Sequence, residues 1–358
     1  MTNKKNTSLT NVNSHRIYYL DVLRTLACLS VILLHSSSKY AVKNWGAFDF
    51  WIGISFNSIS RFCVIIFVMI SGALLLDEKY KYTTQKIIKH IKKMIIFFVF
   101  WSAIYCIIYQ IIEPILQNKS INYKKIIEVF FTGHYHLWFV YMIIGLYLIV
   151  PLLRLWVKDE NKKQVEYFII LSIVFSYLIP QITLIGKYYS NIFNYINNII
   201  EGELKLNYVT GYTTYFILGW YLHNYTVKHK KLLYLLGIFS LILSVFGSYK
   251  LSITKQSPIL LFDDFSLIML LYSSTVFLFI KEKYINSKSN KFINVISENS
   301  LGIYALHAFF VNKTYLIISK IGINIAILNI PLVFLSSFLL SFLLSYILSK
   351  IPVLKKIV

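Results

Sequence analysis

Arg24 and His35 are the first residues in this chain whose types and spacing suggest chemistry. They enclose the ten residues from Thr25 to Leu34, almost all of which are apolar. A helix that crosses a bilayer needs roughly 20 apolar residues, so a helix through this stretch must take one or both groups into or near the hydrocarbon. Because ionisable side chains inside membranes usually line a pocket or pathway, the pattern indicates a polar site within an apolar helix.

The spacing of the two groups lets them act on one molecule. Eleven residues make about three helical turns, so Arg24 and His35 share one helix face and lie about 16 Å apart along the axis. Asp21 lies one turn before Arg24, close to the same stripe. The face thus offers a cation at one end and a general base at the other. In the structural alternative, Arg24 snorkels to the headgroups beside Asp21, and His35 is solvated among serines 36–38.

Composition places the helix in a membrane protein. Of 358 residues, 57% are hydrophobic and only 14% are charged, whereas soluble domains carry about 25% charged residues. The net charge of +21 would suit a nucleic-acid partner, but the Lys and Arg residues lie in short clusters between apolar runs. That arrangement follows the positive-inside rule. We therefore expect membrane lipids, and no nucleic acid, as partners. The lysine-rich run Lys79–Lys93 is expected to contact anionic lipid headgroups.

The apolar runs predict an all-α polytopic bundle of about ten transmembrane helices. Every connection on one side is basic, so we expect both termini in the cytoplasm. Residues 1–15 are expected to form a disordered cytoplasmic tail, 16–358 a single membrane domain, and 191–200 an interfacial helix. The predicted spans are 19–38, 59–76, 94–112, 137–157, 165–184, 211–226, 232–250, 265–280, 301–319 and 329–349.

The cysteines predict neither a disulfide framework nor a metal site. Cys28, Cys63 and Cys106 all fall inside predicted spans and are widely separated. We expect them to pack as small apolar residues, and we predict no bound metal.

Five stretches in order resemble the acyltransferase-3 family, the integral-membrane enzymes that O-acylate bacterial surface polysaccharides and other exported carbohydrates. Together they place the resemblance over about residues 16–350. They are "YLDVLRTLACLSVILLH" (19–35), "SRFCVIIFVMISGALLL" (60–76), "HLWFVYMIIGLYLIVPLLR" (136–154), "YFILGWYL" (215–222) and "LGIYALH" (301–307).

The resemblance implies a reaction in a bacterial cytoplasmic membrane. The donor would be cytoplasmic acyl-CoA, with acetyl-CoA favoured and no permanently bound cofactor. The acceptor would be a hydroxyl of a cell-surface or exported polysaccharide or glycolipid. Arg24 and His35 carry over as the catalytic pair. A guanidinium grips phosphate oxygens or orients a carbonyl, and an imidazole takes a proton from a hydroxyl or carries the acyl group itself.

Other residues are weaker substrate-binding candidates beside Asp21. Arg61 stands where some family members have two arginines, and it is expected at the outer start of a helix as an acceptor or acyl contact, or as a plain interfacial arginine. His136 is expected at the outer face, where an aromatic belt would also place it, with His134 a lesser candidate. His307 is expected in a polar pocket shared with Glu298 or Asn299, because a buried imidazole is costly without a partner.

Two other classes of protein fit the composition. A polysaccharide exporter or flippase would also carry intramembrane charges, but it should show helices broken by Gly or Pro at paired midplane positions. The six prolines here lie mostly at helix ends. A membrane sensor is a further alternative, although the sequence shows no signalling domain.

Overall fold

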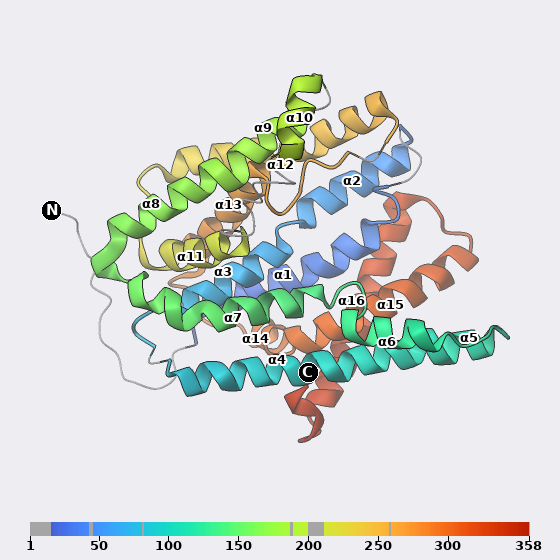
Figure 1. Cartoon of the computed structure of the whole chain (residues 1–358). Helices are drawn as coiled ribbons and strands as arrows, with labels where there is room; N and C mark the ends of the chain where they lie inside the picture. The colour runs from blue at the N-terminus through green and yellow to red at the C-terminus, as the bar shows by residue number, and fades with distance from the viewer. Residues whose placement is uncertain are drawn as a thin grey trace.

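The chain forms an all-helical bundle. A computed structural model describes residues 16–42, 46–80, 82–186, 189–199, 211–257 and 259–357, and in these ranges it contains no β-strand (Figure 1). The expected tail, residues 1–15, lies outside the described residues. The helices are α1 (Tyr18–Ser37), α2 (Phe48–Ser60), α3 (Cys63–Leu75), α4 (Thr84–Cys106), α5 (Glu113–Leu116), α6 (Tyr123–Thr132), α7 (Trp138–Trp156), α8 (Lys162–Ser172), α9 (Ile179–Gly186), α10 (Asn191–Ile199), α11 (Gly211–Asn224), α12 (Lys230–Lys255), α13 (Leu267–Tyr284), α14 (Lys291–Glu298), α15 (Ser300–Lys320) and α16 (Ala326–Ser349).

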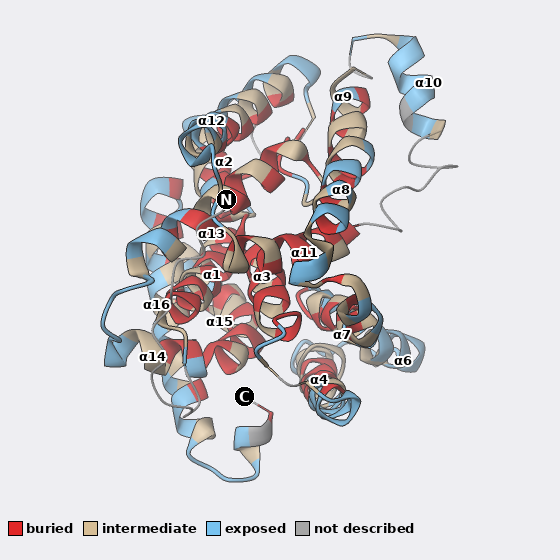
Figure 2. Cartoon of the chain, turned by 90° about the vertical axis from the view of Figure 1, so that its left-hand side faces the viewer, coloured by how far each residue is buried: buried red, intermediate tan, exposed pale blue. Residues whose placement is uncertain are grey.

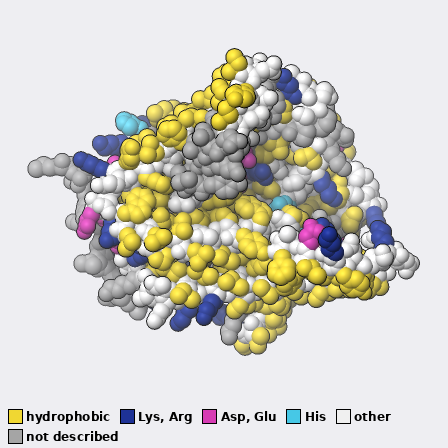
Figure 3. All heavy atoms as spheres, viewed as in Figure 1, with side chains coloured by type: hydrophobic (Ala, Val, Ile, Leu, Met, Phe, Trp, Pro, Cys, Tyr) yellow, Lys and Arg dark blue, Asp and Glu magenta, His cyan; other side chains and the backbone are white. Residues whose placement is uncertain are grey.

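Eight helical segments of the described chain are long and apolar enough to cross a membrane. They are α1, α2 with α3, α4 with α5, α7, α8 with α9, α12, α15 and α16. Helices also form at the predicted spans 211–226 and 265–280, but α11 has only 14 residues and α13 carries Lys281 and Lys283 in its last turn. Hydrophobic side chains cover most of the face in Figure 3, and Lys and Arg gather mainly near its margins. The predicted all-α polytopic bundle is confirmed.

Helix ends that the sequence predicts on one side of the membrane lie together. Arg16 pairs with Glu298, which joins the start of α1 to the end of α14. Lys281 of α13 donates to the carbonyl of Leu222 at the end of α11. At the opposite end of the bundle, the Ala326 amide donates to Asp49 at 2.9 Å, which joins the starts of α16 and α2.

The core lies around α1 and α3, which are buried in the middle of the bundle (Figure 2). Helix α3 packs against α11 with backbone in contact with backbone. A Cβ atom at Gly72 would lie 1.8 Å from the Phe216 carbonyl oxygen, and one at Gly219 would lie 2.1 Å from the Met69 carbonyl oxygen. Only glycine permits this approach, which membrane helices use to gain close packing.

Arg61 lies at a break between α2 and α3, two residues before α3 begins. The apolar run is 28 residues long, from Phe48 to Leu75, so the predicted span 59–76 covers only its second part. At the break, the Ser60 hydroxyl donates to the carbonyls of Phe56 and Asn57. Such bonds from a side chain to the preceding turn bend helices.

Helix α4 begins ten residues before the predicted span 94–112. The Thr83 side chain caps the helix by accepting a hydrogen bond from the Lys86 amide, so part of the lysine-rich run is helical. The expected interfacial stretch 191–200 contains α10, whose Ile192 and Tyr195 are exposed.

Candidate active site

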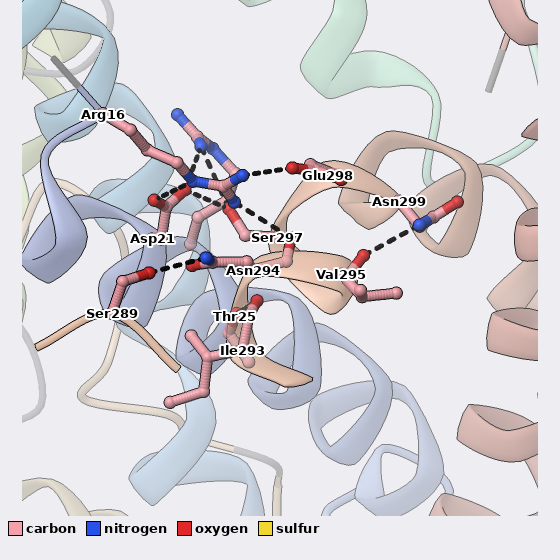
Figure 4. Close-up of polar contacts among 11 residues, drawn as sticks. Arg16, Asp21, Thr25, Ser289, Ile293, Asn294, Val295, Ser297, Glu298 and Asn299 are labelled. Carbon is pink, nitrogen blue, oxygen red and sulfur yellow. Dashed lines mark hydrogen bonds and ion pairs between the residues drawn. The ribbon is translucent and has the colours of Figure 1, made fainter. Parts of the chain in front are cut away.

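Arg24 is held in place by the carboxylate of Asp21. Asp21 Oδ1 accepts hydrogen bonds from Arg24 Nη1 at 3.2 Å and from Ser297 Oγ at 2.6 Å. Asp21 Oδ2 accepts from Arg16 Nε at 2.6 Å, so groups from α14 and from the start of α1 converge on one acid (Figure 4). Asp21 therefore orients Arg24 and neutralises part of its charge.

Glu298 belongs to this network and does not share a pocket with His307. Its carboxylate pairs with Arg16, and its side chain is 60% exposed. Arg16 also donates to the Asn294 carbonyl at 3.0 Å. The structure thus places Glu298 at the helix ends predicted to be cytoplasmic. Arg16 was not predicted as part of the site. It lies at the edge of the polar N-terminal region, where no helical repeat relates it to Arg24 and His35.

A first cavity of about 240 Å³ opens beside Arg24. Residues of α1, α3, α4, α7 and α15 form its walls. Its polar groups come from Arg24, Ser71, Tyr82, His90, Tyr147 and Ser300, and the rest of its lining is mostly apolar. The cavity therefore combines a cation with a largely hydrophobic wall, as small-molecule sites usually do.

A second cavity of about 150 Å³ lies beside His35, farther along α1. Arg61, His136, Trp138 and Asp264 line it with His35. Among the described residues, none forms a hydrogen bond with the His35 ring, so its nitrogens are available to a bound molecule. The candidates His35, Arg61 and His136, which are distant in sequence, thus meet in one site.

His307 completes a group of imidazoles around His35. The ring centroid of His307 lies 5.2 Å from that of His35 and 5.1 Å from that of His136. His307 Nδ1 donates to the Tyr304 carbonyl at 2.5 Å, which leaves Nε2 as an acceptor. The Nε2 atoms of His307 and His136 are buried without a partner among the described residues.

His134 extends the group toward the α6–α7 connection. Its Nδ1 lies 3.0 Å from Nδ1 of His136. Burial lowers the pKa of His134 to about 4 and holds the pKa of His136 well below its usual value. Both rings are therefore neutral near pH 7. Within the described ranges, no group of three or more His, Cys, Asp or Glu side chains has a geometry suited to a metal ion.

Arg61 is anchored so that its side chain lines the second cavity. Its Nε donates to the Phe262 carbonyl at 3.3 Å, and its guanidinium lies 5.2 Å from the centroid of the Phe262 ring. The stacked, half-buried guanidinium brings a fixed positive charge to the cavity that holds His35.

Phe139 and Tyr304 separate the two cavities. Both residues line both cavities, and their ring centroids are 5.7 Å apart. Phe67 packs against the same partition, with its centroid 5.9 Å from that of Phe139. The Tyr304 hydroxyl donates to the His136 carbonyl. The cavities therefore lie back to back along α1, with Arg24 on one side of the aromatic pair and His35 on the other.

Tyr304 and Asp264 are site residues that sequence reasoning missed. Tyr304 stands three residues before His307 in "LGIYALH", so the helical repeat already places both on one face. Asp264 lies in the connection between α12 and α13, where no periodicity relates it to the other residues.

Comparison with known protein families gives one match. The model of an acyltransferase domain matches residues 17–350, which include every helix that lines the two cavities. Comparisons with curated proteins and with solved structures give no match.

Proposed function

The chain belongs to the acyltransferase-3 family, and from this premise we propose that it transfers an acyl group from cytoplasmic acyl-CoA to a carbohydrate hydroxyl. The family and the apolar helices make it a membrane acyltransferase. We propose acetyl-CoA as the donor and a cell-surface or exported polysaccharide or glycolipid as the acceptor. The site of action would be the cytoplasmic membrane of a bacterium.

The two back-to-back cavities are the observation that carries this proposal. Arg24 lies in one and His35 in the other, and their eleven-residue spacing along α1 corresponds to about 16 Å. The pantetheine arm of coenzyme A is long and thin. In this arrangement a phosphate of coenzyme A would bind near Arg24. The arm would then extend past Phe139 and Tyr304 and place its thioester near His35.

The donor would bind in the first cavity. Arg24 offers guanidinium N–H groups to phosphate or carbonyl oxygens, and the contacts with Asp21 and Ser297 hold it in one orientation before the donor arrives. The apolar walls suit the methylene groups of pantetheine. The predicted cytoplasmic position of these helix ends agrees with a donor made in the cytoplasm.

The chemistry would take place in the second cavity. His35 takes the proton of the acceptor hydroxyl, and the oxygen attacks the thioester carbonyl carbon. The C–S bond then breaks, and the coenzyme A thiolate recovers the proton from the imidazolium. Arg61 supplies positive charge where the carbonyl oxygen becomes an oxyanion. In a covalent route His35 first accepts the acyl group and then passes it to the acceptor.

The test is transfer by the purified, reconstituted full chain. Proteoliposomes are supplied with acetyl-CoA labelled in the acetyl group and with glycan extracted from cells that lack the protein. An acyltransferase moves the label to the glycan and releases free coenzyme A. An exporter leaves the label on coenzyme A, and that result would overturn the proposal. Mass spectrometry of surface glycans, with and without the gene, identifies the acyl group and the acceptor.

A further inference from the structure

The connection between α12 and α13 is fixed on its α12 side by two serines. Ser252 Oγ accepts a hydrogen bond from the Ile259 amide at 2.9 Å and donates to the Ile259 carbonyl at 3.1 Å. Ser248 Oγ accepts from the Leu261 amide at 2.9 Å. Because both serines are buried, these bonds hold the connection against the helix.

Contacts from α11 and from the break after α2 hold the rest of the connection. Arg61 Nε binds the Phe262 carbonyl. The hydroxyl of Tyr215 donates to the Asp264 carbonyl at 2.5 Å, and that of Tyr212 donates to Asp264 Oδ2 at 2.6 Å. The backbone and one carboxylate oxygen of Asp264 are thus fixed before any ligand binds, as expected of a binding residue rather than of a loose surface acid.

Asp264 lies half-buried in the wall of the second cavity, with His35 and Trp138. Tyr212 occupies Oδ2, and among the described residues no group donates to Oδ1. Trp138 also lines this cavity, is 42% exposed, and has its ring centroid 6.0 Å from that of Tyr212. The cavity therefore offers a free carboxylate oxygen and a flat aromatic surface beside the histidine.

We propose that Asp264 binds the acceptor sugar and sets which sugar is used. Oδ1 accepts a hydrogen bond from a hydroxyl next to the one that is acylated, and Trp138 packs on the apolar C–H face of the ring. A carboxylate only accepts hydrogen bonds, so the group that it binds on the sugar must be a donor such as a hydroxyl. A sugar without that neighbouring hydroxyl leaves Oδ1 unpaired and is rejected. This inference rests on the proposed acyl transfer to carbohydrate.

The experiment compares acceptors that differ by one hydroxyl. Reconstituted full-chain protein receives labelled acetyl-CoA and the methyl glycosides of glucose, galactose and N-acetylglucosamine, each with its monodeoxy derivatives. For the wild-type protein, kcat/KM should fall about 10- to 100-fold for one deoxy derivative, as expected for a lost hydrogen bond to a charged group. Asp264→Ala should lower kcat/KM for the parent sugar by a similar factor. In this variant, kcat/KM should then be the same for the parent sugar and for that deoxy derivative.

Two further variants isolate the carboxylate. Asp264→Asn keeps the size of the side chain and an accepting oxygen. Its ratio of kcat/KM between the parent sugar and the deoxy derivative should therefore lie between those of the wild-type protein and Asp264→Ala. Asp263→Ala is the matched control, because Asp263 is the exposed neighbour and its Oδ1 accepts from the Phe265 amide in the same connection. This variant should discriminate as the wild-type protein does. The KM for acetyl-CoA should remain unchanged in all three, which also reports correct insertion.

The possible failures point to different conclusions. If Asp264→Ala and Asp264→Asn transfer acetyl with wild-type discrimination, Asp264 does not bind the acceptor, and the proposed function stands without it. If the wild-type protein binds acetyl-CoA but transfers label neither to these sugars nor to the extracted glycan, the proposed function is overturned, and the role of Asp264 with it.

Discussion

Phe139 and Tyr304 form the boundary between the cavity that holds Arg24 and the cavity that holds His35, with their ring centroids 5.7 Å apart. Neither residue carries a charge, and we expect the pair to limit what passes from one cavity to the other. An acyl-transfer site gains from such a boundary, because it keeps water from the thioester until the donor and acceptor are both in place.

Phe139→Ala should therefore uncouple donor breakdown from transfer. With the aromatic partition opened, water reaches the thioester, and release of coenzyme A without acceptor should rise relative to the wild-type protein. The measurement is thiol release from acetyl-CoA by the reconstituted protein, with and without acceptor. Phe139→Leu retains most of the apolar volume and is the control. Equal acceptor-free release in all three proteins would show that the aromatic pair does not exclude water.

Arg24→Lys should weaken donor binding despite the conserved charge. The planar guanidinium, which donates to Asp21 and Ser297 and would also bind the donor, is replaced by an ammonium group that acts as a point charge. We expect the KM for acetyl-CoA to rise on the order of tenfold, as for one lost charge-assisted hydrogen bond, with a larger rise for Arg24→Ala. Both proteins should insert normally. An unchanged KM in Arg24→Lys would leave Arg24 only an electrostatic role.

His35→Ala should abolish most acyl transfer and leave donor binding nearly unchanged. The loss of a general base costs on the order of 10²–10⁴ in rate. If His35 instead carries the acyl group, the wild-type protein should hold labelled acyl in the absence of acceptor, and mass spectrometry of the peptide containing residue 35 should detect it. His229→Ala, at an exposed histidine, is the control. Wild-type turnover by an inserted His35→Ala protein would exclude His35 from the chemistry.

Gly72→Ala and Gly219→Ala should destabilise the bundle, because the added Cβ would lie 1.8 and 2.1 Å from backbone oxygens of the partner helix. Forcing two backbones apart typically costs about 1–3 kcal/mol or more. Gly145→Ala is a matched control, since it also lies within a helix but has no atom within 4 Å of the added Cβ. Its Tm in detergent should stay the same or rise. Equal Tm values for all three variants would contradict the close α3–α11 packing.

Acid should destabilise the protein through His134 and His136. Burial lowers the pKa of His134 to about 4 and lowers that of His136 as well, whereas an unfolded histidine titrates near 6.5. Between these values the unfolded chain binds more protons than the folded one. The stability contribution is therefore complete above pH 6.5 and is lost as the pH falls toward 4. The Tm of His134→Gln should fall less over this interval than the wild-type Tm, and an identical fall would exclude this titration.

Several features follow from local sequence alone. The all-α membrane class comes from runs of apolar residues that are long enough to span, with basic residues between them. That Arg24 and His35 share one face needs only the repeat of a single helix. The predicted span 59–76 was too short, because the apolar run continues back through the break between α2 and α3 to Phe48, and hydropathy alone does not show that these two helices form one segment.

Tertiary structure alone decided which candidates meet. His136, His307 and Asp264 come from three elements far apart in sequence, and Glu298 pairs with Arg16 instead of joining His307. The physical reason is that both the lipid-facing and the buried faces of a membrane helix are apolar. The amphipathic pattern that orients a helix in a soluble protein is then weak, so only packing, such as the contact between Gly72 and Phe216, determines how each helix is rotated and which side chains face the cavities.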